Sequence, residues 1–227
     1  MNTGTLYGVG IGPGDPKLLT LRAVELIREN EIIAVPGEAA CETVAYRIAV
    51  QAVPELAGKK LVALPMPMTK DKAVLEKKHD QAAEKVEAYL REGKNVVFLT
   101  LGDPTVYSTY LYVHERVAEH GYPTEIVSGI TSFCAAAARL DMGLVEKSQE
   151  LHVIPASYQI EEALEMSGTK VLMKAGKKIS AVKEILKSRG ADAMMIENCG
   201  MENERIYRCA DEIPENAGYY SLIIIKE

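Results

Sequence analysis

Three loops of this chain combine residue types that bind small polar ligands, and two of them repeat the same tripeptide. Gly14-Asp15-Pro16 follows an apolar stretch at residues 6–11, and Gly102-Asp103-Pro104 follows another at residues 96–99. A third loop, at residues 128–132, joins a glycine to serine and threonine hydroxyls. Together the loops offer backbone amides, hydroxyls and two carboxylates, but no evident general base. Such a set suits the binding of a small polar ligand more than acid–base chemistry.

The stretch at residues 95–108 predicts how the second of these loops is positioned. Its apolar run at 96–99 is typical of a central strand in a parallel sheet that is covered on both faces. Open α/β sheets place their ligands beyond the carboxyl ends of such strands. Pro104 suits the start of a helix, so we expect a helix that begins near Thr105 and carries Tyr107 and Tyr110. A plainer alternative is that Asp103 only caps this helix.

Apolar strands alternate with amphipathic helices along the first half of the chain. We expect strands at residues 6–11, 31–35, 61–64, 96–99 and 124–127. This alternation predicts a parallel sheet with crossover helices. The pattern restarts after residue 128, and its last two strands have no helix between them, which favours antiparallel pairing in a mixed sheet. The predicted fold class is α/β, with two α/β domains at residues 1–128 and 129–227 and the active site in the cleft between them.

Composition excludes several classes of protein. Of the 227 residues, 48% are apolar and 26% are charged, as in soluble globular proteins. The net charge is −6 and there is no dense basic cluster, so nucleic acid is not expected as a partner. No apolar run approaches the ~20 residues of a membrane span, and the opening residues lack the pattern of a signal peptide. We therefore expect a cytoplasmic protein that does not contact a membrane.

The cysteines, glycines and serines each suggest a function that their spacing does not support. The four cysteines form no CxxC pair, which favours free thiols over a disulfide or a metal site. The glycines at positions 8, 10, 12 and 14 miss the dinucleotide fingerprint, because Pro13 stands where its third glycine is required. Pro13 and Pro16 also remove amides that a pyrophosphate would need. No histidine and aspartate can be assigned to Ser108, Ser128 or Ser132 as a hydrolase triad.

The three loops, taken in register, carry a family resemblance. GIGPGDP at residues 10–16, LGDPTVYS at 101–108 and SGITSF at 128–133 resemble, in this order and spacing, the tetrapyrrole (corrin/porphyrin) methyltransferase family. The resemblance continues through VLMKAGK at 171–177 and a closing YYSLIII. The opening TLYGVGIGPGDPKLLTLRA and the stretch PMPMTKD are similar to the subgroup that methylates carbon 20 of precorrin-2 or cobalt-factor II. One departure is Ser128-Gly129, where many members have Pro-Gly.

The resemblance implies methyl transfer from S-adenosyl-L-methionine to carbon 20 of precorrin-2 or cobalt-factor II, in cobalamin (vitamin B12) biosynthesis. It also implies a cofactor folded into the cleft, a tetrapyrrole that faces the first loop, and a homodimer. The cofactor-binding residues that it implies are Ile11, Gly102, Asp103, Val106, Thr131, Ser132, Met173, Cys199 and Gly200. The corresponding candidates for binding the tetrapyrrole and its carboxylates are Gly12, Pro13, Gly14, Lys17, Lys174 and Lys177.

The implied reaction asks little acid–base chemistry of the protein. A sulfonium methyl group is already activated, so alignment and exclusion of water are the main contributions of the chain. A base must then take the proton from carbon 20, and the candidate catalytic residues are Asp15, Tyr107 and His114. No metal site is expected, because one histidine is not a metal site and cobalt would arrive with the substrate.

Three alternatives stay open at this point. The first is another position or substrate within the family, such as uroporphyrinogen, another precorrin or the diphthamide precursor. The second is a module that binds S-adenosylmethionine without turnover. The third is a nicotinamide oxidoreductase, which the failed glycine fingerprint disfavours.

Overall fold

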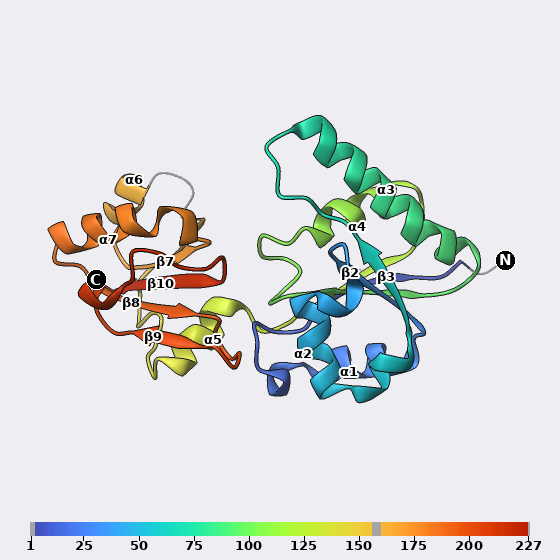
Figure 1. Ribbon diagram of the computed structural model, residues 1–227, viewed down its shortest axis with the longest axis horizontal. Helices are drawn as coiled ribbons and strands as arrows, with labels where there is room; N and C mark the ends of the chain where they lie inside the picture. The colour runs from blue at the N-terminus through green and yellow to red at the C-terminus, as the bar shows by residue number, and fades with distance from the viewer. Residues whose placement is uncertain (1–2, 156–159, 227) are drawn as a thin grey trace. The chain divides into compact units, whose positions relative to one another are not determined.

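The computed structural model describes residues 3–155 and 160–226, which form two compact units that divide between Thr131 and Ser132. Each unit has its own five-stranded sheet and its own core (Figure 1). The expected fold class is confirmed, because the first sheet is parallel and the second is mixed. The placement of an active site between the domains stays a prediction.

The first unit is built on a parallel sheet with the strand order β3-β2-β4-β1-β5. The strands are β1 (Leu6–Gly10), β2 (Ile32–Pro36), β3 (Lys60–Leu64), β4 (Val96–Thr100) and β5 (Thr124–Val127). The central strand β4 pairs with β1 and β2, and all of its residues are buried. Its register places Thr100 beside Gly10, so β4 and β1 end at the same level. The loops that follow these strands therefore leave the sheet side by side.

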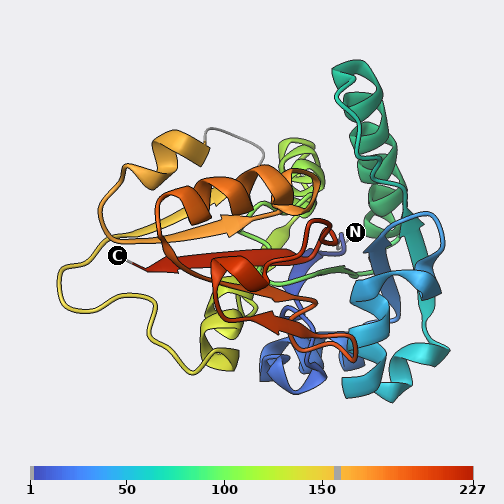
Figure 2. The ribbon, with the colours of Figure 1, turned by 60° about the vertical axis from the view of Figure 1, so that its left-hand side comes forward.

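Helices cover both faces of this sheet, with α3 and α4 on one face and α1 and α2 on the other (Figures 1 and 2). The helices are α1 (Leu21–Glu29), α2 (Val44–Ala52), α3 (Lys72–Arg91) and α4 (Tyr110–Glu119), with short 3₁₀ turns η1 (Pro16–Leu18), η2 (Ala40–Glu42) and η3 (Pro54–Gly58). Side-chain oxygens of Thr20, Thr43 and Asp71 cap the amino ends of α1, α2 and α3. At the start of α4, the Tyr110 ring packs edge to face against the Phe98 ring of β4, with centroids 5.2 Å apart. Both side chains are fully buried.

The helix after the second loop begins at Tyr110, so the expectation that it begins near Thr105 is wrong. Side chains around this segment bind its backbone in a turn instead. Asp103 accepts a hydrogen bond from the Thr105 amide at 2.8 Å, and the Ser108 hydroxyl accepts one from the Tyr110 amide at 3.1 Å. Such local bonds compete with helical hydrogen bonding and delay the helix.

The second unit holds a mixed sheet with the strand order β6-β7-β10-β8-β9. Its strands are β6 (Leu151–Pro155), β7 (Thr169–Met173), β8 (Asp192–Glu197), β9 (Arg205–Tyr207) and β10 (Ser221–Lys226). The central strand β10 runs antiparallel to both β7 and β8, so the expected mixed sheet is confirmed. The expected antiparallel pairing of the last two strands with each other is wrong, because β8 lies between β9 and β10 and pairs with both. Its helices are α5 (Ser132–Arg139), α6 (Ile160–Leu164) and α7 (Ile179–Ser188), with 3₁₀ turns η4 (Gly176–Lys178) and η5 (Ala210–Glu212). Within this unit α7 and α5 lie on opposite faces of the sheet (Figures 1 and 2).

Three properties of the whole chain bear on function. Among residues 3–155 and 160–226, no helix combines the length and the apolar character that crossing a membrane requires. In the same residues, no group of three or more histidine, cysteine, aspartate or glutamate side chains is arranged to hold a metal ion. The four cysteines are free thiols, of which Cys41, Cys134 and Cys209 are exposed and Cys199 is buried.

Candidate active site

The three predicted loops meet at the carboxyl edge of the first sheet, where their backbones touch. Gly12 and Gly102 form a two-residue antiparallel bridge, with amide-to-carbonyl distances of 3.2 and 2.8 Å. Gly129 lies against both other loops. A Cβ atom placed on it would stand 2.2 Å from the Gly102 carbonyl oxygen and 2.7 Å from the Gly10 carbonyl carbon. Only glycine, which has no Cβ atom, allows the backbones to come this close, so the loops contact one another directly through their main chains.

The Asp103 carboxylate ties the second loop to the third. Its Oδ1 accepts hydrogen bonds from the Thr105 amide and hydroxyl at 2.8 and 2.5 Å, and its Oδ2 accepts one from the Gly129 amide at 2.9 Å. Burial by itself would raise the pKa of Asp103, but these bonds and one from Ser128 outweigh it, so the pKa is lowered. The carboxylate is 7% exposed and ionised at neutral pH, and its oxygens are used within the unit.

Tyr107 stands at the tip of the turn between Asp103 and α4. It takes a left-handed backbone conformation, with φ of 49°, and its side chain is 45% exposed. Left-handed bulky residues cost about 1–3 kcal/mol and gather at functional sites. Val106, beside it, is half-buried and donates its amide to the Asp103 carbonyl at 3.2 Å.

The other two candidate bases are held by separate partners. His114 Nδ1 lies 3.0 Å from the Tyr110 hydroxyl, which also donates to the Glu125 carbonyl of β5 at 3.4 Å. Burial lowers the pKa of His114 and raises the pKa of Tyr110, so both side chains are neutral at pH 7. Asp15 instead caps η1 by accepting from the Lys17 amide at 2.8 Å.

Thr131 presents a buried polar atom that lacks a partner within the described chain. Its Oγ1 has less than 1 Å² of exposed surface and no hydrogen bond. Buried hydroxyls are almost always paired, so an unpaired one at a loop edge indicates a missing ligand or water. Of the first loop, Ile11, Gly12, Pro13 and Gly14 are buried and Lys17 is exposed.

The predicted residues of the second unit also gather at one edge of its sheet. Since β7 and β8 both run antiparallel to β10, their carboxyl ends share that edge, which places Met173 and Lys174 at the same side as Cys199 and Gly200. Met173 is half-buried, and Lys174 Nζ lies 5.8 Å above the centre of the Tyr219 ring. Burial raises the pKa of the Cys199 thiol to about 11, which makes it unreactive.

Two further predicted residues complete this unit. Ser132 is the first residue of α5. Lys177 lies in η4, and its side chain is outside the described part of the chain. Sequence reasoning missed the contacts that hold these loops, above all the ion pair between Arg139 and Glu204, whose partners are 65 positions apart. No local motif signals such a pair.

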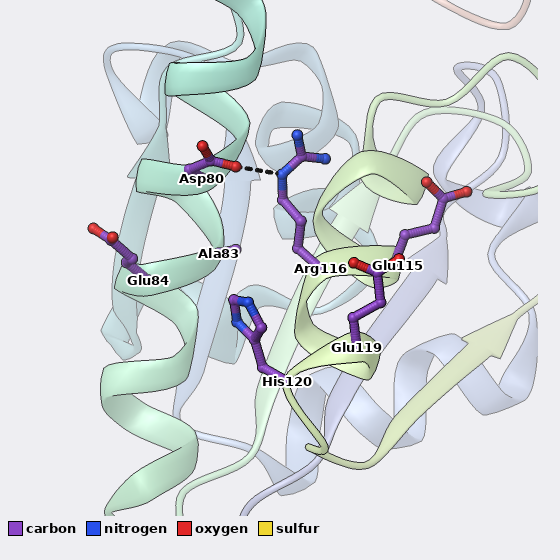
Figure 3. Close-up of a pocket in the computed structure, with 7 residues that line it drawn as sticks. All are labelled: Asp80, Ala83, Glu84, Glu115, Arg116, Glu119 and His120. Atoms are coloured by element: carbon purple, nitrogen blue, oxygen red, sulfur yellow. Dashed lines mark hydrogen bonds and ion pairs between the residues drawn. The ribbon is translucent and has the colours of Figure 1, made fainter.

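A separate pocket of about 470 Å³ lies between α3 and α4, and none of the predicted site residues lines it (Figure 3). It is lined by Asp80, Ala83, Glu84, Glu115, Arg116, Glu119 and His120. Arg116 points from α4 toward α3, where it bonds Asp80 at 2.7 Å and also pairs with Glu76. We interpret this feature as a charged seam that joins two helices.

Replacing Arg116 with methionine is expected to lower the free energy of unfolding by about 1 kcal/mol. The Arg116 side chain is 17% exposed, but the side chains of Asp80 and Glu76 are 60% and 67% exposed, so water screens much of the attraction. Urea unfolding at low and high salt measures the effect, and the difference from the parent protein should shrink in 1 M salt. The control is Lys94→Met, whose exposed pair with Glu92 joins residues two apart, and it should leave the urea midpoint unchanged. Equal midpoints for Arg116→Met and the parent protein would contradict the prediction.

The fold and the site define a class of protein before any comparison is made. A parallel sheet with glycine-built loops at its carboxyl edge, followed by a mixed sheet, is a two-unit α/β protein suited to a small polar ligand. The family of tetrapyrrole (corrin/porphyrin) methylases matches residues 5–212. The chain therefore belongs to this family of S-adenosylmethionine-dependent methyltransferases, and the resemblance seen in its loop motifs is confirmed.

Relatives and solved structures agree over nearly the whole chain. A Methanocaldococcus jannaschii protein described as "Probable cobalt-precorrin-2 C(20)-methyltransferase" is 37% identical, over 97% of this chain and 95% of its own length. The cobalt-precorrin-2 C(20)-methyltransferase of Salmonella typhimurium is 31% identical, over 99% of this chain and 97% of its own. The uroporphyrin-III C-methyl transferase of Thermus thermophilus, solved with S-adenyl homocysteine, matches with a TM-score of 0.73 at 22% identity, covering 99% and 98% of the two chains. At this identity the structural match supports the fold alone.

Proposed function

We propose that this protein transfers the methyl group of S-adenosylmethionine to carbon 20 of precorrin-2 or its cobalt-containing counterpart, cobalt-factor II, in cobalamin biosynthesis. The observation that carries the proposal is the 37% identity, over nearly the full length of both chains, to a relative described with this activity. The loop that holds Asp103 and the loop that holds Thr131 supply the binding edge that this chemistry needs.

The residues of the first unit fit the cofactor. Thr131 offers a buried hydroxyl without a hydrogen-bond partner among the described residues, and it lies in the loop that Gly129 holds against the other two. We assign Ile11, Gly102, Val106 and Thr131 to the cofactor. Asp103 acts by fixing the shape of the two loops, because its own oxygens are already hydrogen-bonded.

Residues of the second unit extend the assignment. Ser132 begins α5, and Met173 with the backbone of Cys199 and Gly200 would meet the adenine end. Bound there, S-adenosylmethionine supplies an activated methyl group. The chain aligns the acceptor carbon with it and excludes water, and this alignment lowers the activation barrier by up to about 7–11 kcal/mol. Lys17, Lys174 and Lys177 are assigned to the carboxylates of the ring.

Among the candidate bases we favour Tyr107. It lies in the loop that follows Asp103, its backbone is left-handed, and it is 45% exposed, so a bound ligand can reach its hydroxyl. After the methyl group has been transferred, the Tyr107 hydroxyl would accept the proton that leaves carbon 20 and pass its own proton to water. Four free thiols support the expected cytoplasmic setting, because reducing compartments keep thiols unpaired.

Product analysis tests the proposal. The protein is incubated with S-adenosylmethionine and either precorrin-2 or cobalt-factor II, and mass spectrometry with NMR locates the new methyl group. We expect one methyl group at carbon 20 and one equivalent of S-adenosylhomocysteine. A methyl group at another carbon, or methylation of uroporphyrinogen instead, would overturn the proposed position. Cofactor binding without release of S-adenosylhomocysteine would indicate a binding module.

Light scattering on the same sample tests the expected homodimer, whose mass would be twice the 24.8 kDa of one chain.

Replacing Thr131 with valine should change stability and cofactor binding in opposite directions. Removing an unpaired buried hydroxyl should leave the ligand-free protein as stable as before or up to about 1 kcal/mol more stable. Losing the hydroxyl as a ligand should weaken S-adenosylhomocysteine binding about tenfold, as calorimetry would measure. The matched control is Thr169→Val, since the Thr169 hydroxyl is buried but donates to the Leu144 carbonyl at 2.6 Å. That control should lose about 1 kcal/mol of stability and keep its affinity. Unchanged affinity in Thr131→Val would remove Thr131 from the site.

A further inference from the structure

The loop that follows β8 is short, strained and closed upon itself. Asn198 and Gly200 both have left-handed backbones, with φ of 51° and 77°. The Met201 amide donates to the Asn198 carbonyl at 2.9 Å, and the Glu204 amide donates to the Met201 carbonyl at 3.0 Å. Asparagine takes this conformation more readily than most non-glycine residues, and the Asn198 side-chain amide lies 3.5 Å from the Asn203 carbonyl oxygen.

The Glu204 side chain bonds across this loop to its backbone. Its Oε2 accepts a hydrogen bond from the Gly200 amide at 2.6 Å, back across the loop. Both of its oxygens accept from Arg139 Nε at 3.0 Å, and Oε1 also accepts from Arg139 Nη2 at 2.5 Å. The Glu204 side chain is 11% exposed. Arg139 lowers the pKa of Glu204, which is therefore ionised at neutral pH.

Arg139 connects this loop to a second segment of the proposed cofactor site. It is the last residue of α5, and the first residue of the same helix is Ser132. A cation at the carboxyl end of a helix is favourable, because the helix dipole is negative there. Glu204 thus links three groups: the Gly200 amide, the arginine, and through the arginine the helix that begins at Ser132.

We propose that Glu204 is a positioning residue, which holds the backbone of Cys199 and Gly200 in the conformation that receives the adenine end of the cofactor, with Arg139 fixing the carboxylate in place. The inference rests on the proposed function, because it takes this loop as part of the cofactor site. It adds the residue that shapes the loop without touching the cofactor. The bond to Gly200 is the part that sets the shape, and the ion pair is the part that attaches the loop to α5.

Three variants separate these two parts. Glu204→Ala removes both bonds and should weaken S-adenosylhomocysteine binding about tenfold, because the loop must then be ordered when the cofactor binds. The double variant Arg139→Glu, Glu204→Arg restores an ion pair but cannot accept from the Gly200 amide, since arginine has no acceptor. It should recover only part of the thermal midpoint lost in Glu204→Ala, because it places an anion at the carboxyl end of α5, and it should keep the weak binding. Lys183→Ala is the control. Lys183 lies on α7 and pairs with Glu215 at 2.9 Å, so the change removes an ion pair that does not involve the loop.

Calorimetry, thermal unfolding and steady-state kinetics read out the result. In Glu204→Ala we expect KM for S-adenosylmethionine to rise about tenfold, with kcat and KM for the tetrapyrrole within about twofold of the parent protein. Binding equal to the parent in Glu204→Ala, or affinity restored by the double variant, would overturn the inference. If Glu204→Ala does not fold, the double variant alone carries the test. Failure of the parent protein to bind S-adenosylhomocysteine would instead overturn the proposed function.

Discussion

Gly129→Ala is expected to lower the free energy of unfolding by about 3 kcal/mol and to reduce methyl transfer at least a hundredfold. The added Cβ atom would stand 2.2 Å from the Gly102 carbonyl oxygen and 2.7 Å from the Gly10 carbonyl carbon. Both obstacles are backbone atoms at the ends of neighbouring strands, so neither can rotate aside as a side chain would. The third loop must move away from the other two, and a displacement of about 1 Å in a binding loop is enough for such a loss of rate.

Urea unfolding and the rate of S-adenosylhomocysteine release measure the two effects. Gly58→Ala is the matched control in the same unit, because a Cβ atom there would meet nothing within 4 Å and its backbone angle is an ordinary one. That control should keep full activity and unfold at the parental urea concentration. If Gly129→Ala behaves like Gly58→Ala, the close contact among the three loops is not a feature of the protein in solution.

Much of the fold could be predicted because its signals are local. The run of apolar residues in β4 and the regular alternation of strand and helix indicate a parallel sheet directly, since both follow from periodicity. The missing helix between β9 and β10 indicates a mixed sheet, but it does not reveal that β8 lies between these two strands and pairs with both. These features need no knowledge of which distant residues meet.

The start of α4 shows where local signals mislead. Pro104 and the residues after it are consistent with a helix, and the sequence alone favours one there. Asp103 and Ser108 instead capture the amides of Thr105 and Tyr110. Whether a side chain caps a helix or replaces its first turn depends on where the neighbouring strand places it. That position is fixed by tertiary structure.

The candidate site likewise has features that the sequence predicts and features that it does not. Glycines and hydroxyls in three loops were enough to predict that the loops lie together at one edge of the sheet, because parallel strands bring their carboxyl ends together. The sequence does not reveal that Gly10, Gly102 and Gly129 touch, nor that Arg139 pairs with Glu204. Such contacts join residues far apart in the chain, and no spacing rule covers them.

Asp103→Ala is expected to weaken S-adenosylhomocysteine binding at least tenfold and to destabilise the protein by about 3 kcal/mol. The change leaves the amides of Thr105 and Gly129 without their acceptor and releases the second loop from the third. Asp15→Ala is the control, since Asp15 accepts one bond at the start of a short 3₁₀ turn. It should cost about 1 kcal/mol and change the affinity less than twofold. Equal calorimetric affinities for the two variants would contradict the role given to Asp103.

The pH dependence of Asp103→Asn isolates the charge of this carboxylate. The pKa of Asp103 lies below its usual value of 3.8 in the folded protein, so the ionised group stabilises the fold at every pH above that value. That contribution is lost as the pH falls through the folded pKa, and asparagine never has it. The difference in unfolding free energy between parent and variant should therefore stay constant from pH 7 to about pH 5 and shrink below pH 4, as urea unfolding would measure. A difference that persists unchanged to pH 3 would mean that shape alone, and not charge, makes Asp103 hold the two loops together.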